Sequence, residues 1–436
     1  MPTITVDQAK LVLNTFAATF QNNLVAKDLV SWNKYDTEMN DRNALRVSEQ
    51  VGPRYAITQT TSGVQDLSSG TQDSVFGSEM FTVNQVFGSS MGWSDFVKIR
   101  DIGEARESTA ITNAATNLAE KIDAYILRVV AQASNNWVGT PGNAIDSLDD
   151  FTAGYVRLKE EGVPDGDLRA VLTYGDQAAL ASNITSLPAL DDIASGIYRE
   201  GFTGKVGGIN TMFTQQLSNI TAGTRAASGA NIKMNAATQN VNYKDVAVSG
   251  SPGQYLSQTI NVTIGTGTET VKDGEVFTIA GVYAWDNRLG QSIGRLQQFR
   301  VIGDYTATGG VVAAMRIFPA MIVPGSGTGG DVNVNTAHAT VDSVAGAAAL
   351  ITFLGTASTA YKPRVLLAKD AIQVNTADLI MPATGVGMRK QLTKLPLSVR
   401  MWKNSNFATG QHDVRFDVVL TANVRDRRKL VRLSGQ

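Results

Sequence analysis

Residues 101–134 restrict the fold more than any other segment, because they predict a single long helix. Thirty-odd residues rising 1.5 Å each form a rod of roughly 50 Å, longer than an ordinary globular helix. Such a rod suits either a large flat molecule or the core of an enzyme. The helix is indicated by apolar residues that recur at spacings of three and four, at Ile111, Ala115, Leu118, Ile122, Tyr125 and Val129.

A second amphipathic helix opens the chain. Thr5 and Gln8 have the spacing of a capping box. The stripe that follows is narrow and aromatic, so it must be covered either by the chain's own body or by a neighbouring molecule. Its members repeat every four residues, at Val12, Phe16, Phe20 and Leu24.

Residues 46–92 predict a long two-stranded arm. Two extended runs flank a middle segment, Thr58–Ser78, that is rich in Ser, Thr, Gly and Gln. A connection of more than about fifteen residues with little structure is uncommon inside a compact domain. The segment is therefore either a surface loop or a loop that acts on something else.

Residues 146–187 predict a compact α/β region. Ser147 and Asp150 form a second capping box, and the helix they begin ends at Gly162. A strand at 169–174 and a helix at 176–187 follow, an alternation typical of a small mixed sheet with helices packed on it. We expect the first helix to turn four side chains inward, those of Leu148, Phe151, Tyr155 and Leu158.

Residues 203–361 differ from the rest of the chain in composition and period. They contain nine basic and eight acidic residues in 159, and apolar residues alternate with a period of two, as between Ile260 and Ile264. Turn signals such as Asp273-Gly274 separate the runs. The pattern predicts a separate β-rich domain, a small barrel or a sandwich, between flexible linkers at 223–229 and 324–330.

The chain closes with two strong strands, Leu397–Lys403 and Asp413–Val424. Alternate residues of the second, from Val414 to Val424, are apolar and lie on one face. Alternation over ten or so residues predicts a hairpin longer than the usual strands of five or six. Its polar turn, near Asn404–Gln411, is expected to project.

The composition excludes several classes of protein. With no cysteine and only two histidines, the chain has no disulfide, thiolate nucleophile or multi-histidine metal centre. Lys+Arg 38 against Asp+Glu 39 gives a net charge of −1, which argues against a dedicated nucleic-acid binder. No signal peptide is predicted, and the longest uncharged apolar stretch, Ser343–Ser358, is shorter than the roughly 20 residues of a membrane span. We expect a soluble intracellular product.

One motif points to catalysis. Gly88-Ser89-Ser90-Met91-Gly92 matches G-x-S-x-G, the nucleophile elbow of serine hydrolases, with His412 or His338 as the base. An elbow needs a buried parallel strand before the serine, whereas residues 81–87 alternate polar and apolar like a half-exposed strand. A simple Gly/Ser turn is the competing interpretation.

Three further patterns have ordinary interpretations. Residues 325–330 fit G-x-G-x-x-G, but a β pattern follows them and indicates a linker. The pairs Asp149-Asp150 and Asp191-Asp192 are adjacent, so their side chains point to different sides. The basic run from Arg425 to Arg432 indicates a solvated or paired edge more than a nucleic-acid contact.

We therefore predict no catalytic, cofactor-binding or metal site, no cofactor, and no enzymatic activity. A chain of this size with a projecting helix, a long arm and a long hairpin suits contact with copies of itself. Two alternatives stay open: a serine hydrolase using Ser90, and a β-rich surface or tail adhesin.

The order of these parts resembles the major capsid protein of tailed double-stranded DNA bacteriophages, and more narrowly the coat proteins of the short-tailed Salmonella phage group. Relatives often have His where Ala368 stands. The resemblance covers most of the chain and is carried by Lys272–Val282, Gln298–Val301, Ile317, Pro319, Lys369–Ala371, Val399–Trp402 and Arg415–Val418.

The resemblance implies an α+β tailed-phage capsid fold with an inserted β-barrel domain. In that fold the N-terminal arm and the extended loop would reach over neighbouring subunits, and the barrel would aid folding of the subunit. The implied divisions are an N-terminal arm (1–35), an extended loop (36–95), a peripheral domain with the spine helix (96–145), a central axial domain (146–220), the β-rich insertion (221–355), and a return to the central domain with the long hairpin (356–436).

The resemblance also implies partners and a location. Copies of the chain would form hexameric and pentameric capsomers of an icosahedral shell, assembled in the host bacterial cytoplasm. A scaffolding protein and a portal are expected, together with packaged double-stranded DNA held without sequence-specific contact. A decoration protein is a further expected partner, and a membrane is not.

Overall fold

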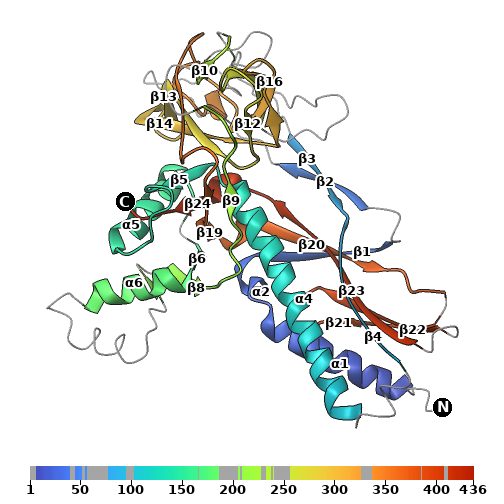
Figure 1. Ribbon diagram of the computed structural model, residues 1–436. Helices are drawn as coiled ribbons and strands as arrows, with labels where there is room; N and C mark the ends of the chain where they lie inside the picture. The colour runs from blue at the N-terminus through green and yellow to red at the C-terminus, as the bar shows by residue number, and fades with distance from the viewer. Residues whose placement is uncertain are drawn as a thin grey trace, which may run out of the picture. The chain divides into compact units, whose positions relative to one another are not determined.

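The computed structural model describes residues 6–39, 45–51, 55, 77–94, 103–164, 166–185, 205–206, 209–226, 232–236, 239, 256–325, 336–383, 385–406 and 411–436 (Figure 1). The chain divides into two compact units. Unit 1 consists of Met1–Val47, Phe81–Val129 and Lys369–Asp426. Unit 2 consists of Ser48–Met80, Val130–Ala368 and Arg427–Gln436.

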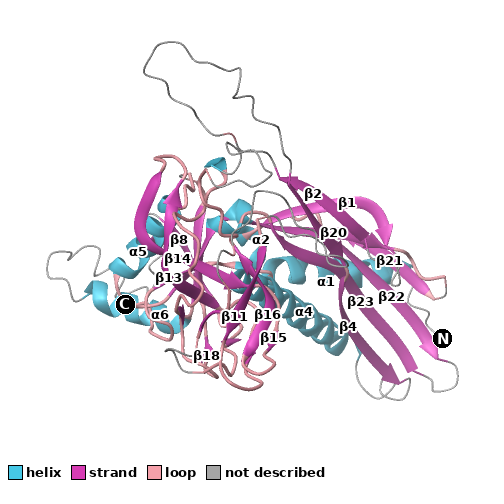
Figure 2. Cartoon of the chain, turned by 90° about the horizontal axis from the view of Figure 1, so that it is seen from above, coloured by secondary structure: helices cyan, strands magenta, loops and turns pink. Residues whose placement is uncertain are grey.

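Unit 1 is a six-stranded sheet with helices packed on it. β23 is its centre: β4 pairs along one edge, and β22 and β20 pair along the other, all antiparallel. β1 pairs parallel with β20, and β21 pairs with β22 (Figure 2). The strands are β1 (Ser31–Met39), β4 (Gln85–Ser94), β20 (Ile372–Leu379), β21 (Val386–Gln391), β22 (Ser398–Asn406) and β23 (Gln411–Val424).

The helices of this unit are α1 (Val6–Asn23), α2 (Ala26–Leu29) and α4 (Gly103–Ala133), whose last residues belong to unit 2. The spine helix is therefore confirmed as a single α4 of 31 residues. Phe87 on β4 packs against Tyr125 on α4, with ring centroids 5.3 Å apart.

The stripe of α1 is covered by the chain's own sheet. Phe16 and Phe20 are fully buried, and Phe16 stacks on Phe416 of β23 with ring centroids 3.9 Å apart. The expectation of a projecting helix is therefore wrong for this stripe. The stripe finds its cover here because alternate apolar residues of β23 present a complementary face.

Unit 2 contains the expected mixed α/β sheet. Its strand order is β5-β24-β19-β6-β8-β7, with β6 parallel to β8 and β24 parallel to β5. The capping box of Ser147 and Asp150 is present, but Leu148 is 55% exposed rather than turned inward. The elements are α5 (Leu148–Glu160), α6 (Tyr174–Thr185), β5 (Asn136–Val138), β6 (Leu168–Leu172), β7 (Lys205–Val206), β8 (Ile209–Phe213), β19 (Arg364–Ala368), the 3-10 turn η2 (Arg427–Lys429) and β24 (Leu430–Leu433).

The β-rich segment of unit 2 is a closed barrel. Its strands run in the order β10-β11-β16-β14-β13-β17, and an isolated bridge between Lys233 and Leu350 joins the two ends of the order. Alternate residues such as Ile260, Val262 and Ile264 fill the core. The strands are β10 (Lys233–Met234), β11 (Gln258–Thr263), β13 (Val276–Asp286), β14 (Gln291–Val301), β16 (Val311–Phe318) and β17 (Ile351–Phe353), with the short pairs β12 (Thr270–Val271) to β15 (Tyr305–Thr306) and β9 (Ile220–Thr221) to β18 (Ala360–Tyr361).

The remaining described elements are β2 (Leu45–Val51) and β3 (Gly77–Val83), which pair as a two-stranded sheet, and the 3-10 turn η1 (Lys369–Ala371). This pairing confirms two strands of the arm, but residues 85–92, which the sequence also predicts to belong to it, lie in β4 of the unit 1 sheet. Most of its middle segment lies outside the described residues, as do Asp191-Asp192, residues 326–330 and the tip of the closing hairpin. None of the described helices has the length and apolarity to cross a membrane.

Candidate functional site

Ser90, the serine of the hydrolase motif, lies in the middle of a strand. Residues Gly88–Gly92 belong to β4, and Ser90 pairs with Arg415 of β23. No strand-to-helix turn is present, so neither a nucleophile elbow nor a Gly/Ser turn forms there. A Cβ on Gly88 would lie 2.7 Å from Oδ1 of Asp417, so a side chain at this position would have to displace that carboxylate.

Of the two candidate bases, His412 does not pair with Ser90. The backbone of His412 pairs with that of Trp93, and His412 lies three residues from Arg415, the partner of Ser90. Three residues of a strand span about 10 Å. The strand register therefore does not place His412 opposite Ser90.

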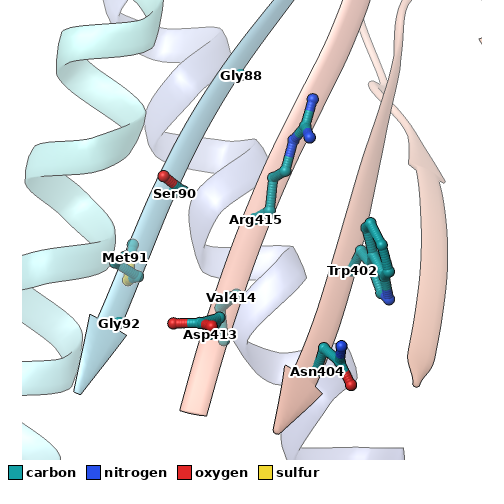
Figure 3. A pocket seen from close by; sticks show the side chains of 9 residues that line it. All are labelled: Gly88, Ser90, Met91, Gly92, Trp402, Asn404, Asp413, Val414 and Arg415. Atoms are coloured by element: carbon teal, nitrogen blue, oxygen red, sulfur yellow. The ribbon is translucent and has the colours of Figure 1, made fainter. Parts of the chain in front are cut away.

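A hollow of about 580 Å³ lies over this part of the sheet (Figure 3). Ser90 and Arg415 face it from β4 and β23, and an arginine has no lone pair to act as a general base. The hollow exists because β4 carries almost no side chain on this face. Its lining is Gly88, Ser90, Met91, Gly92, Trp402, Asn404, Asp413, Val414 and Arg415.

Beside the hollow, one buried carboxylate holds two arginines. Asp417 is 0% exposed, and it accepts from Nη2 of Arg400 at 2.7 Å and from Nε of Arg415 at 2.5 Å. Arg400 also donates to the carbonyl of Ile380 at 2.7 Å. The cluster links β22 and β23 and has a structural role, because its carboxylate is fully engaged by cations.

In unit 2 the barrel is joined to the α/β sheet by reciprocal polar contacts. The side chain of Gln298 on β14 accepts from the backbone N–H of Trp137 at 2.8 Å and donates to its carbonyl at 2.9 Å. Arg295, also on β14, reaches the end of α5, with Nε 2.6 Å from Glu160 and Nη2 3.0 Å from Glu161. The barrel and α5 are thereby fixed to each other at several points.

Arg432 closes the end of the spine helix. Its guanidinium is fully buried, with Nε donating to the carbonyl of Ala131 at 2.7 Å and Nη2 to that of Ser134 at 3.2 Å. Burial lowers the pKa of Arg432, and the neighbouring Arg300 lowers it further. Carbonyls at a helix C-terminus are the acceptors that a cation favours. The basic run therefore contains an internal cap, a role that neither interpretation of its sequence anticipated.

The described residues hold no group of three or more His, Cys, Asp or Glu side chains that could ligate a metal ion. The acid pair Asp149-Asp150 serves α5, since both lie in its first turn. The partners of Arg432, Gln298 and Arg295 lie 134 or more residues away in sequence. No local sequence signal identifies such pairs.

The family model described as "P22 coat protein - gene protein 5" matches residues 1–429. The chain belongs to the P22 coat protein family. It is a structural major capsid protein of a bacteriophage. The resemblance inferred from the sequence is confirmed, and the α+β class is visible in the elements themselves.

Solved structures similar to this P22 coat protein family member include that of Mycobacterium phage Che8, with 10% identity, a TM-score of 0.42 and coverage of 91% of this chain and 94% of that one. The asymmetric unit of the bacteriophage PhiM1 mature capsid shares 11% identity, with a TM-score of 0.44 and coverage of 93% and 85%. Comparison with curated proteins gave no match. At these values the family match is the observation that decides the function.

Proposed function

We propose that this coat protein assembles with copies of itself into the hexameric and pentameric capsomers of a closed icosahedral shell around double-stranded DNA. The match to the coat protein family over residues 1–429 carries this proposal. Assembly takes place in the host bacterial cytoplasm with a scaffolding protein and a portal, and a decoration protein is a further candidate partner. The packaged DNA is held without sequence-specific contact.

The charge balance supports a shell that encloses DNA without binding it tightly. A net charge of −1 leaves no general excess of cations to displace counterions from phosphates. Several arginines that a DNA-binding surface would need are engaged inside the chain, including Arg364, Arg400 and Arg432. The chain acts as a structural protein rather than as an enzyme, and the position of Ser90 within β4, away from any strand-to-helix turn, supports this assignment.

One exposed face supports contact with another copy. On α5, Leu148 is 55% exposed and Val156 is 46% exposed, two turns apart on the same side of the helix. Large obligate interfaces are more apolar than ordinary surfaces. We assign this face to subunit contact.

Electron microscopy of the chain coexpressed with its phage's scaffolding protein tests the proposal. The wild type is expected to form closed shells, and the double variant Leu148→Ser, Val156→Ser is expected to fold but to give at least several-fold fewer shells, because it removes apolar area from a contact. Asp149→Ser, an exposed change on the same helix, is the matched control and should assemble like the wild type. Only monomers, in every condition, would refute assembly and favour an adhesin.

A further inference from the structure

Two buried arginines of unit 2 lie beside one turn of the barrel. The turn is formed by residues 272–275, between β12 and β13. Arg300, on β14, is 7% exposed, and Arg432, on β24, is 0% exposed. The turn and both arginines belong to unit 2, but β14 and β24 are strands of different sheets. The barrel and the α/β sheet therefore each contribute one buried cation at this turn.

Each of the two arginines lies against a different residue of the turn. Nη2 of Arg300 donates to Oδ1 of Asp273 at 3.0 Å. A Cβ added to Gly274 would lie 3.4 Å from Nη2 of Arg432, so this guanidinium passes directly beside the glycine. Because Asp273 and Gly274 are consecutive in the chain, the two guanidiniums are neighbours.

The carboxylates at this turn do not balance its cations. Asp273 pairs with Arg300, and Glu275 pairs with Arg225, a third arginine. The guanidinium of Arg432 donates to backbone carbonyls, and no salt bridge to it forms within the described part of the chain. Three guanidiniums thus share two carboxylates. A buried charge is costly unless it is paired.

Arg427, on η2, adds positive charge from a further element. Its guanidinium carbon lies 5.0 Å from the ring centroid of Phe318, and Phe318 is the strand partner of Arg300. Burial lowers the pKa of Arg300 to about 10, and Arg427 acts in the same direction against Asp273. Burial lowers the pKa of Arg432 to about 9, and Arg300 lowers it further. The cations around the turn therefore repel one another.

Both arginines also have a buried N–H group without an acceptor. Nε of Arg300 and Nη1 of Arg432 are shielded from solvent, and neither donates to any atom of the described residues. The cost of a buried donor without an acceptor is greater when the group is charged. Two unused donors on neighbouring cations are the pattern that an anion satisfies, since it supplies both an acceptor and the missing negative charge.

We propose that Arg300 and Arg432 bind one small monovalent anion of the chloride class, which accepts from Nε of Arg300 and Nη1 of Arg432. One negative charge offsets the guanidinium that has no carboxylate, and two donors suffice for a spherical ion. Phosphate carries at least three acceptor oxygens, more than these two donors can serve. The complete burial of Arg432 keeps out the carboxylate of another molecule. The anion links β14 to β24 and does not depend on assembly.

Urea unfolding of the full-length, unassembled chain tests the anion site. An ion that binds only the folded state stabilises it by mass action, so above the Kd each tenfold rise in chloride should raise the equilibrium constant for folding nearly tenfold. Chloride is varied from about 1 to about 100 mM, a range wide enough to show this dependence. Gluconate, which is too large for a buried site, keeps the ionic strength constant. An equilibrium constant that does not change with chloride overturns the proposal.

Two variants separate the site from a general effect of salt. Arg300→Met removes one of the two proposed ligands, so the dependence on chloride should vanish. Arg128→Met removes an exposed arginine of α4 and should keep the dependence of the wild type. A dependence that survives in Arg300→Met, or that disappears in both variants, contradicts the proposal.

Diffraction from wild-type crystals grown in bromide gives a test that needs no variant to fold. Bromide replaces chloride in such a site and scatters anomalously. We expect an anomalous peak in contact with Nε of Arg300 and Nη1 of Arg432. A water molecule at this position, or bromide found only elsewhere on the chain, would show that the two N–H groups do not bind an anion.

Discussion

Asp123 in unit 1 and Asp176 in unit 2 are both buried carboxylates that accept backbone N–H groups beside a helix start, yet their surroundings differ in one respect. Asp176 is 0% exposed and receives a bidentate arginine, with Nε and Nη2 of Arg364 each 2.8 Å from its oxygens. It also accepts from the N–H and the hydroxyl of Thr173, at 3.0 and 2.7 Å. Among the described residues, Asp123 accepts only from the backbone N–H groups of Val25 and Ala26.

The arginine reverses the direction of the pKa shift. Burial acts to raise the pKa of Asp176, but the bonds from Arg364 and Thr173 outweigh it and hold the pKa below 3.8. The contribution of Asp176 to stability is therefore present above pH 3.8 and is lost as the pH falls through the lower pKa of the folded state. For Asp123, which has no arginine partner among the described residues, burial instead raises the pKa to about 6. The two similar carboxylates therefore differ in the direction of their pKa shift.

Asp176→Ala removes the carboxylate that pairs with Arg364, and it is expected to lower the free energy of unfolding more than the other variants. It leaves the buried guanidinium of Arg364 without its carboxylate, which costs about 3–5 kcal/mol of unfolding free energy. Urea unfolding measures the loss of unfolding free energy, and amide hydrogen exchange in β19 and β6 shows where protection is lost. The control is Asp167→Ala, which removes the exposed partner of Arg169 and should cost less than about 1 kcal/mol. Equal losses in the two variants would show that the bidentate pair is not special.

Arg432→Met sharpens the comparison from the side of the cation. Arg432 is the cationic counterpart of Asp123, because among the described residues its hydrogen bonds go to backbone carbonyls, those of Ala131 and Ser134 among them. Methionine keeps an apolar stem but leaves buried carbonyls of α4 without a donor, so we expect a loss of about 2–3 kcal/mol. Hydrogen exchange at the C-terminal turn of α4 reports it. Arg425→Met, an exposed change in the same basic run, should be nearly neutral, and a similar loss there would argue against the cap.

The sequence predicted those parts of the fold whose signals are local. The spacing from Ile111 to Val129 gave the spine helix, and the alternation from Val414 to Val424 gave the long strand β23. Composition and period separated the barrel from its surroundings. The cover of the α1 stripe could not be predicted, because Phe16 and Phe416 are 400 residues apart and either partner, own chain or neighbour, fits an apolar stripe.

The polar contacts were beyond local inference for the same reason. Asp123 appears in the sequence as one acid on a helix, and Arg364 and Asp176 lie 188 residues apart. At Ser90 a local signal was misleading. The five residues of the motif match a nucleophile elbow, but they pair with β23 and form part of a strand. Where the partner is local, as in the capping box of Ser147 and Asp150, spacing was sufficient.

Ser147→Ala tests the local member of this series and is expected to have the smallest effect. Asp150 is a third buried carboxylate, 1% exposed, and it accepts from the backbone N–H groups of Ser147 at 3.3 Å and Gln436 at 3.1 Å. The variant leaves those bonds in place and removes only the hydroxyl that accepts from the N–H of Asp150, so about 1 kcal/mol should be lost. Exchange of the first-turn amides of α5 measures it. Ser147→Gly should lose only a few tenths, because glycine exposes the N-terminus to water. A loss as large as that of Asp176→Ala would mean that charge pairing does not determine which of these contacts contributes most to stability.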